Sequence, residues 1–304
     1  MSVTVLSHPA CNRHNIGDDH PENPARLYAI SDQILSSGLE FVILQRDAKL
    51  ATIEQLALAH DRAYIQSVLS KNPVAGQIWL DDDTAIMNKS LEAALYAAGA
   101  GIFAVDLVMQ GQDEQVFCAI RPPGHHAEAA QAMGFCVFNN IAIAAKYALE
   151  VHNLQRVVII DFDVHHGNGT EQIFKHDNRV LFCSSFEHPF YPFTDASSLP
   201  LCLKMPLAAG STGNVFRQGF RAEWLPAIQA FKPELILVSA GFDAHQEDDM
   251  AHLQWHENDY AWIGNELKQL AQECCAGRIV ACLEGGYAHS ALGRSVVALL
   301  KAWI

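Results

Sequence analysis

The sequence of 304 residues predicts an α/β fold, in which helices cover both faces of a mostly parallel sheet. Two observations lead to this prediction. Short runs rich in Val, Ile and Leu recur along the chain, with longer helix-like segments between several of them. Polar or glycine-rich residues directly follow five of these runs, and parallel strands bring such residues to one edge of a sheet. We therefore expect an active site at the C-terminal strand ends of a single domain over residues 1–304.

The predicted elements follow one another along the chain as strands and helices. The apolar runs near residues 4, 117, 158, 182, 237 and 280 are TVLS, EQVFCAI, RVVIID, RVLFCSS, ELILVSA and RIVACLE. Helices are predicted over residues 89–109, 138–151 and 258–274. The first of these helices is rich in Ala and Gly and contains Asp106, which favours a core helix over a membrane span. Segments 186–214 and 241–259 have little periodicity and are predicted to be loops around the site.

The composition limits the classes of partner. With 20 Lys and Arg against 34 Asp and Glu, the net charge is −14, which argues against nonspecific nucleic-acid or membrane binding and favours cationic partners. The same acidity also aids solubility. Most of the eight cysteines lie in apolar surroundings and none forms a C-x-x-C pair, so we expect reduced core thiols in a cytoplasmic protein. The N-terminal segment lacks the features of a signal peptide.

The segment RVVIIDFDVHHGNGT, residues 156–170, ends a predicted strand with costly polar groups. Asp161, Asp163 and His165 alternate along it, so an extended chain places them on one face. Carboxylates and an imidazole suit a divalent transition metal, and Asp243 at the end of LILVSAGFD is the best further ligand. Single residues of this kind often serve as turn formers or helix caps. Complementary ligands from separate strand ends favour a catalytic metal with open coordination positions.

Further polar groups follow two other predicted strands. The adjacent His125 and His126 of RPPGHHA are candidates for metal ligands or proton-transfer groups. Asp161 and Asn168 are candidates to accept hydrogen bonds from the two imidazoles and to orient them. Tyr287 follows the glycines of LEGGY, where its phenol could donate a hydrogen bond to a reacting group.

Taken together, these motifs resemble the zinc-dependent histone deacetylase superfamily, which includes acetylpolyamine amidohydrolases and bacterial deacetylase-like enzymes. The resemblance extends over nearly the whole chain, through HPENPARL, AHDRAYI, RPPGHHA, GFCVFNNIAIAA, DFDVHHGNGT, SAGFDAH and LEGGY. It implies an arginase-like α/β/α sandwich and the hydrolysis of acyl-lysine amides on basic proteins or peptides. An acetylpolyamine or another small amide remains an alternative substrate with the same mechanism.

The resemblance also implies individual roles. Asp163, His165 and Asp243 match the ligands of one catalytic zinc ion, and His126 matches the general base. His125 matches a second active-site histidine whose share in proton transfer is open. The tyrosine that holds the scissile carbonyl oxygen is matched by Tyr287. A structural potassium ion is implied at Asp161, Asp163, His165, Ser184 and Ser185, and the acyl-lysine tunnel at Gly134, Phe135 and Tyr191.

Two rival functions fit the residues less well. A binuclear manganese ureohydrolase would need a second set of metal-binding carboxylates, which this chain does not show. A catalytically silent reader, which binds a metal and a modified side chain without hydrolysis, would be indicated by loss of Tyr287 or of a metal ligand. Tyr287 and all three candidate ligands are present.

Departures from the family pattern bear on the subclass and the substrate. Asn168 in HHGNG stands where class I enzymes have Asp, which resembles class II and bacterial members and predicts a weaker base at His126. Phe186 stands where relatives often have His, which predicts an unusual rim. In one polyamine deacetylase branch a Glu lies seven residues after the metal-binding Asp; here that position is Met250, which favours acetyl-lysine. The nearby acidic residues of segment 247–249 either recruit cations or form a solvated loop.

Overall fold

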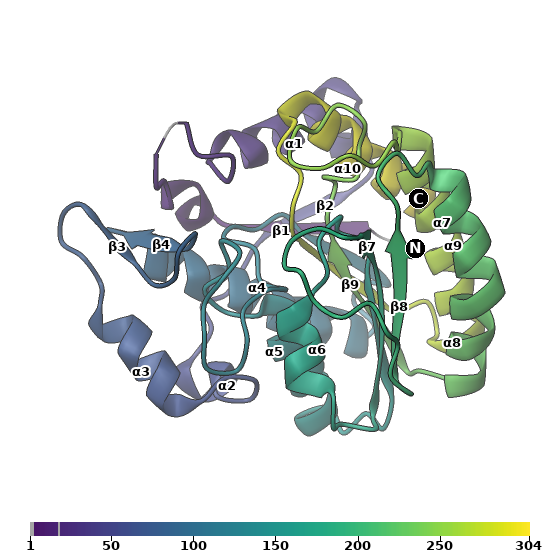
Figure 1. Ribbon diagram of the computed structural model, residues 1–304, viewed down its shortest axis with the longest axis horizontal. Coiled ribbons are helices and arrows are strands. Elements are labelled where there is room, and N and C mark those ends of the chain that lie inside the picture. Colours follow the sequence, from purple (N-terminus) through teal and green to yellow (C-terminus); the bar gives the residue numbers. More distant parts are fainter. Residues whose placement is uncertain (1–2, 18) are drawn as a thin grey trace.

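The computed structural model describes residues 3–17 and 19–304, and its centre is one eight-stranded parallel sheet. The strand order is β2-β1-β5-β10-β9-β6-β7-β8 (Figure 1). Their bounds are β1 Val3–Ser7, β2 Leu44–Asp47, β5 Gln115–Cys118, β6 Val157–Asp161, β7 Val180–Glu187, β8 Cys202–Leu207, β9 Leu235–Ala240 and β10 Ile279–Leu283. A separate antiparallel hairpin pairs β3, Gln77–Trp79, with β4, Ala85–Met87.

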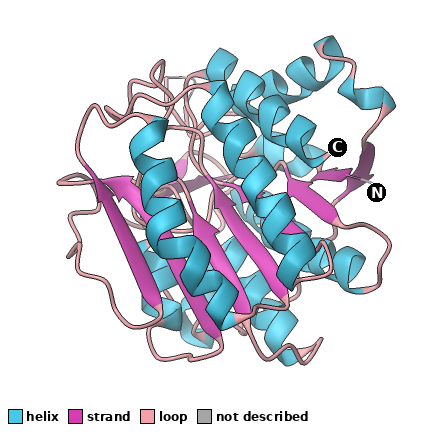
Figure 2. Cartoon of the chain, turned by 90° about the vertical axis from the view of Figure 1, so that its right-hand side faces the viewer, coloured by secondary structure: helices cyan, strands magenta, loops and turns pink. Residues whose placement is uncertain are grey.

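Helices cover both faces of this sheet, which confirms the predicted α/β/α arrangement. On one face lie α4 Ser90–Met109, α5 Asn140–Glu150 and α6 Asn168–Phe174. On the other face lie α1 Ala25–Ser36, α7 Gly213–Gly219, α9 Glu257–Cys274 and α10 His289–Trp303 (Figure 2). On this second face α7 continues through a π-helical turn, Phe220–Trp224, into α8 Leu225–Phe231. Two further helices, α2 Ile53–Leu56 and α3 Arg62–Ser70, lie outside these groups.

The burial of the strands explains which of them the sequence predicts. Every residue of β5, β6, β7, β9 and β10 is buried, as expected of continuous apolar strands covered on both faces. The edge strands β2 and β8 are partly exposed and carry polar side chains, so their sequences lack such a run. Because β8 and the start of α7 lie within segment 186–214, the prediction of a continuous loop there is wrong.

Helix α4 is long and apolar enough to cross a membrane by length and composition alone, but 72% of its most apolar window is buried. It packs against α5, β5 and β10, which confirms the predicted core helix. The small residues have a steric purpose here. A Cβ at Gly99 would lie 1.9 Å from the carbonyl oxygen of Lys49, so only glycine permits this approach.

All eight cysteines are free thiols, and seven of them are buried. Burial raises the pKa of Cys11 to about 11 and that of Cys202 to about 12, which keeps both thiols protonated and unreactive. The expected core location is therefore confirmed for seven of the eight cysteines.

A buried ionic network joins the N-terminal part of the chain to the ends of two central strands. Glu22 accepts hydrogen bonds from Arg26 Nη1 at 3.1 Å and from Arg121 Nη2 at 2.6 Å, and none of the three side chains is exposed. Arg26 also donates to the carbonyl oxygens of Gly286, at 2.7 Å, and of Glu284. The network therefore holds the segment after β10 against the segment after β5.

Replacing Glu22 with Gln is expected to lower the free energy of unfolding at pH 7 by about 3–5 kcal/mol, because two buried guanidinium groups would lose their counter-charge. Burial alone would raise the pKa of Glu22, but Arg121, His14 and Arg26 outweigh it and lower the pKa from 4.5 to about 2. A lowered folded-state pKa contributes stability above pH 4.5, and this contribution is lost as the pH falls towards 2. The difference between wild type and variant should therefore shrink over that range.

Urea unfolding at several pH values measures this difference. The exposed Glu54 of α2 provides a control, because Glu54→Gln removes the same charge without breaking a buried ion pair. A loss below about 1 kcal/mol for Glu22→Gln, the range of surface ion pairs, would contradict the role assigned to the network.

Candidate active site

The candidate site lies at the C-terminal ends of neighbouring strands in the middle of the sheet. Asp163 follows β6 and Asp243 follows β9, and these parallel strands are paired with Asp161 opposite Ser239. The pairing delivers both carboxylates to the same edge, as the parallel arrangement predicts. The segment after β10, which carries Tyr287, lies beside β9 in the strand order.

The predicted metal ligands form one buried cluster. His165 Nδ1 lies 3.0 Å from Asp163 Oδ1 and 3.3 Å from Asp243 Oδ2. Among the described residues, no hydrogen bond of good geometry reaches the buried Oδ2 of Asp243. A Cβ at Gly285 would lie 1.9 Å from that oxygen, so a glycine is needed beside it. Two carboxylates and one imidazole are ligands that suit a divalent transition metal, and the buried Asp243 Oδ2 is free to bind one.

The charges of this cluster also favour a cation. Burial and the nearby charge of Asp163 raise the pKa of Asp243 above its usual value. Burial would lower the pKa of His165, but its contacts with Asp163 and Asp243 outweigh this and raise the pKa to about 10. Two buried carboxylates therefore share one imidazole, and a divalent cation would neutralise both of them.

The adjacent histidines have different partners. His125 Nδ1 lies 3.0 Å from Asp161 Oδ2, and His126 Nδ1 lies 2.8 Å from Asn168 Oδ1. Burial would lower the pKa of His125, but Asp161 and neighbouring carboxylates outweigh it and raise the pKa to about 10. For His126, burial and the nearby charges of His125 and His165 lower the pKa well below 6.5. These opposite shifts favour the cationic form of His125 and the neutral form of His126.

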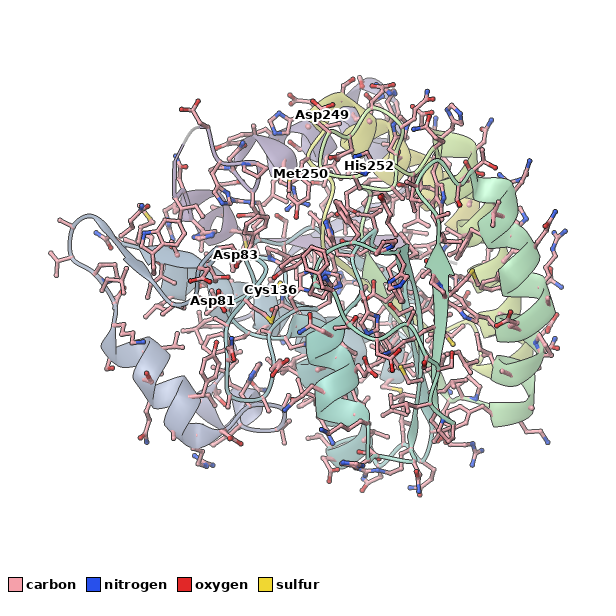
Figure 3. The ribbon with its side chains drawn as sticks, viewed as in Figure 1. Asp81, Asp83, Cys136, Asp249, Met250 and His252 are labelled. Carbon is pink, nitrogen blue, oxygen red and sulfur yellow. The ribbon has the colours of Figure 1, made fainter. Side chains whose placement is uncertain are left out.

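A cavity of about 250 Å³ leads to these groups. It is lined by Asp83, His126, Gly134, Phe135, His165, Phe190, Tyr191, Met250 and Tyr287. All three predicted tunnel residues and Met250 are thus among its walls. Gly134 has a φ of +58°, and a Cβ there would lie 2.3 Å from the His126 ring, so glycine allows the imidazole to rest against the backbone. Figure 3 shows that Asp83 and Met250 approach the cavity from separate segments.

The residues implied for potassium lie directly beside the metal cluster. Asp161 in β6 is opposite Ser184 in β7, and Asp161 Oδ1 accepts a hydrogen bond from the backbone N–H of Asp163 at 3.1 Å. Ser184 and the adjacent Ser185 are buried. Ser184 Oγ lies 2.8 Å from Nδ1 of His166, a residue that the sequence interpretation did not single out.

Several residues that hold the site together were missed by sequence reasoning. Glu284 Oε2 accepts hydrogen bonds from the backbone N–H groups of Gly124, at 2.6 Å, and His125, at 3.1 Å. Arg26 lies over the ring of Tyr287 at 4.9 Å from its centroid. The motifs HPENPARL and LEGGY contain these two residues, but no local pattern indicates their partners, which lie far away in the chain.

The structure contradicts the rim role predicted for Phe186 and, of the two alternatives for segment 247–249, argues against cation recruitment by two of the three acids. Phe186 is only 2% exposed, because β7 continues through it and its ring packs 4.8 Å from that of His166. It is therefore a core residue and does not shape the rim. Asp248 is also buried, and Glu247 is paired with Arg294 at 2.6 Å, so neither is a free acid for recruiting cations. Asp249 alone of these three is exposed and lacks an ion pair among the described residues.

A second group of potential ligands, His245, Glu247 and Glu257, does not form a comparable metal site. Arg294 binds both carboxylates, at 2.6 Å and 2.5 Å. His245 Nδ1 accepts the backbone N–H of Glu247 at 3.1 Å, so the proton of the neutral ring is on Nε2. Neither nitrogen then offers a free lone pair to a metal.

Comparison with known proteins agrees with this geometry. The model of the histone deacetylase domain family matches residues 20–303. Histone deacetylase 14, chloroplastic, of Arabidopsis thaliana is 38% identical over 98% of this chain and 76% of its own length. Human polyamine deacetylase HDAC10 is 37% identical over 97% of this chain and 47% of its own. The crystal structure of the HDA15 HD domain superposes with a TM-score of 0.91 at 30% identity, covering 99% of this chain and 88% of that one.

The fold and the site define an α/β protein with a buried candidate metal cluster at the strand ends, and the family match makes it a hydrolase of the deacetylase class. The chain belongs to the histone deacetylase family. The resemblance inferred from the sequence motifs is thereby confirmed, together with the fold class that it implied.

Proposed function

We propose that this protein is a zinc-dependent protein lysine deacetylase, which hydrolyses acyl-lysine amides and releases acetate and free lysine. We further propose that residues 1–304 form one catalytic domain. The main support is the buried group Asp163, His165 and Asp243 at a narrow cavity that His126 and Tyr287 also line. A cavity of about 250 Å³ with aromatic walls suits a long, thin side chain that ends in an amide.

Asp163, His165 and Asp243 would hold the zinc ion, which when bound polarises the amide carbonyl and lowers the pKa of water towards about 7. His126 donates its Nδ1 proton to Asn168 Oδ1, so its Nε2 is free to accept a proton from the attacking water. The low pKa of His126 keeps this nitrogen unprotonated at pH 7.

The remaining steps involve two proton donors. Burial raises the pKa of Tyr287 well above 10, so its phenol stays protonated and can donate a hydrogen bond to the developing oxyanion. The leaving amine then takes a proton from His126 after its protonation, or from the cationic His125. The Oδ2 atom of Asp161 lies 3.0 Å from Nδ1 of His125 and so holds this imidazole in place.

We also propose a structural potassium ion held by Asp161, Asp163, His165, Ser184 and Ser185, partly through backbone oxygens. The register of β6 and β7 supports this proposal, because it puts Asp161 opposite Ser184 beside the candidate zinc ligands. Such an ion would offset part of the negative charge of the buried carboxylates.

A second candidate substrate is an acetylpolyamine. One relative, 37% identical to this chain, is called a polyamine deacetylase, and the carboxylate of Asp83 lines the cavity. Met250 favours acetyl-lysine over an acetylpolyamine. Its neutral side chain lies in the cavity wall, whereas a carboxylate at that position would attract the distal ammonium group of a polyamine.

We expect kcat/KM to be higher for acetyl-lysine peptides than for acetylputrescine or acetylspermidine. Basic residues beside the acetyl-lysine should increase the rate at low salt, because the chain carries a net charge of −14. Acetate release from both substrate types, measured side by side, tests this. Met250→Glu should shift the ratio towards the polyamines. A tenfold preference of the wild type for an acetylpolyamine, on the order of 1.4 kcal/mol, would favour the second candidate.

A further inference from the structure

We propose that Asp248 is a positioning residue, which holds the backbone of Tyr287 so that its hydroxyl reaches the scissile carbonyl. Its Oδ2 atom accepts hydrogen bonds from the backbone N–H groups of Tyr287, at 2.6 Å, and Ala288, at 3.0 Å. Its Oδ1 atom accepts the backbone N–H of Met250 at 3.0 Å. This inference rests on the role of Tyr287 in the proposed function.

The segment that carries Tyr287 needs an external support. Gly285 and Gly286 precede the tyrosine, and Gly286 has a φ of +119°, a conformation that other residues rarely adopt. Neither glycine can be replaced easily. A Cβ would lie 1.9 Å from Asp243 Oδ2 at Gly285 and 2.9 Å from Phe242 Cβ at Gly286. Because glycine has little conformational preference of its own, contacts with other segments must determine where the phenol lies.

Two buried ions supply these contacts from opposite sides. Arg26 donates to the carbonyl oxygens of Glu284 and Gly286, and its guanidinium lies over the ring of Tyr287. Asp248 accepts the N–H groups that follow, at Tyr287 and Ala288. Hydrogen bonds to ionised groups are stronger than those between neutral groups. The glycine segment is therefore held at its carbonyl groups by a cation and at its amide groups by an anion.

The surroundings of Asp248 agree with this task. The side chain is buried, with 4% of the residue exposed, and no cation forms an ion pair with it among the described residues. Both carboxylate oxygens are occupied by backbone N–H groups. The loop from Asp243 to Met250 thus connects a candidate metal ligand, the support of Tyr287 and a cavity wall.

The test is a double-mutant cycle with Asp248→Asn and Tyr287→Phe, assayed on an acetyl-lysine peptide with uncharged flanks. Asparagine keeps one acceptor oxygen but replaces the other with an NH2 group, which cannot accept a hydrogen bond from a backbone N–H group. The variant therefore cannot accept all three of the hydrogen bonds from Tyr287, Ala288 and Met250. A displacement of about 1 Å at a catalytic group can lower the rate about 10²-fold. We therefore expect Asp248→Asn alone to lower kcat about 10- to 100-fold with its metal content unchanged.

In the Tyr287→Phe background, the same change should lower kcat less than about twofold, because there is no hydroxyl left to position. KM can still rise in both backgrounds through Met250. Asp249→Asn is the matched control: it removes the same charge from the adjacent, exposed residue and should leave kcat unchanged. Equal losses of kcat in both backgrounds, or no loss in either, would overturn the inference.

If the double variant turns over too slowly, the dissociation constant of a trifluoromethyl ketone analogue of acetyl-lysine can be measured instead for all four proteins of the cycle. The hydrate of this ketone resembles the tetrahedral species that the hydroxyl of Tyr287 would contact. Thermal unfolding of each variant separates displacement of the tyrosine from general loss of structure. Failure of the proposed function would be seen differently, as absence of acetate release by the wild type.

Discussion

Replacing Asp243 with Ala is expected to abolish metal binding and deacetylase activity together. Asp243 provides a buried oxygen without a good hydrogen bond, 3.3 Å from His165 Nδ1, and its loss would leave only Asp163 and His165 as ligands. Two protein ligands bind zinc far less tightly than the three of catalytic zinc sites. Since the metal supplies several kcal/mol of transition-state stabilisation, activity should fall by at least about 10³-fold.

Metal content by mass spectrometry and acetate release on the same samples measure this effect. Tyr287→Phe provides the comparison, because it should lose activity while keeping the metal. Wild-type protein treated with a chelator should regain activity on addition of zinc, whereas Asp243→Ala should not. Full activity of a metal-free wild-type sample would contradict the metal mechanism altogether.

Replacing His126 with Ala is expected to lower kcat about 10²- to 10⁴-fold, the usual contribution of a general base, while zinc stays bound. The hydrogen bond to Asn168 Oδ1 leaves only Nε2 of His126 to accept a proton. The other histidine that lines the cavity, His165, is a proposed zinc ligand and so is not available for this task. KM should change little, because the proton transfer takes place in the transition state.

Steady-state kinetics with metal analysis test this prediction. His176 is exposed on the surface, so His176→Ala is a matched control that should retain wild-type rates. A His126→Ala protein that lost zinc, and turned over normally once zinc was resupplied, would show that His126 is a ligand and not the base.

The sequence by itself determined much of the fold and of the candidate site. Strands buried on both faces are continuous apolar runs, so β5, β6, β7, β9 and β10 were predicted, and parallel pairing implied that Asp163 and Asp243 meet. Local spacing was sufficient for Asp163 and His165, because they lie two residues apart on one extended segment.

Only the tertiary structure decided which polar residues are supports and which are free. Asp248 and Asp249 are identical in type and adjacent, yet one is buried against the backbone of Tyr287 and the other faces solvent. Glu22 and Arg121 are 99 residues apart, and no local pattern links them. The physical reason is that burial and hydrogen-bond partners arise from segments brought together by the fold, whereas periodicity in a sequence reports only on neighbours along the chain.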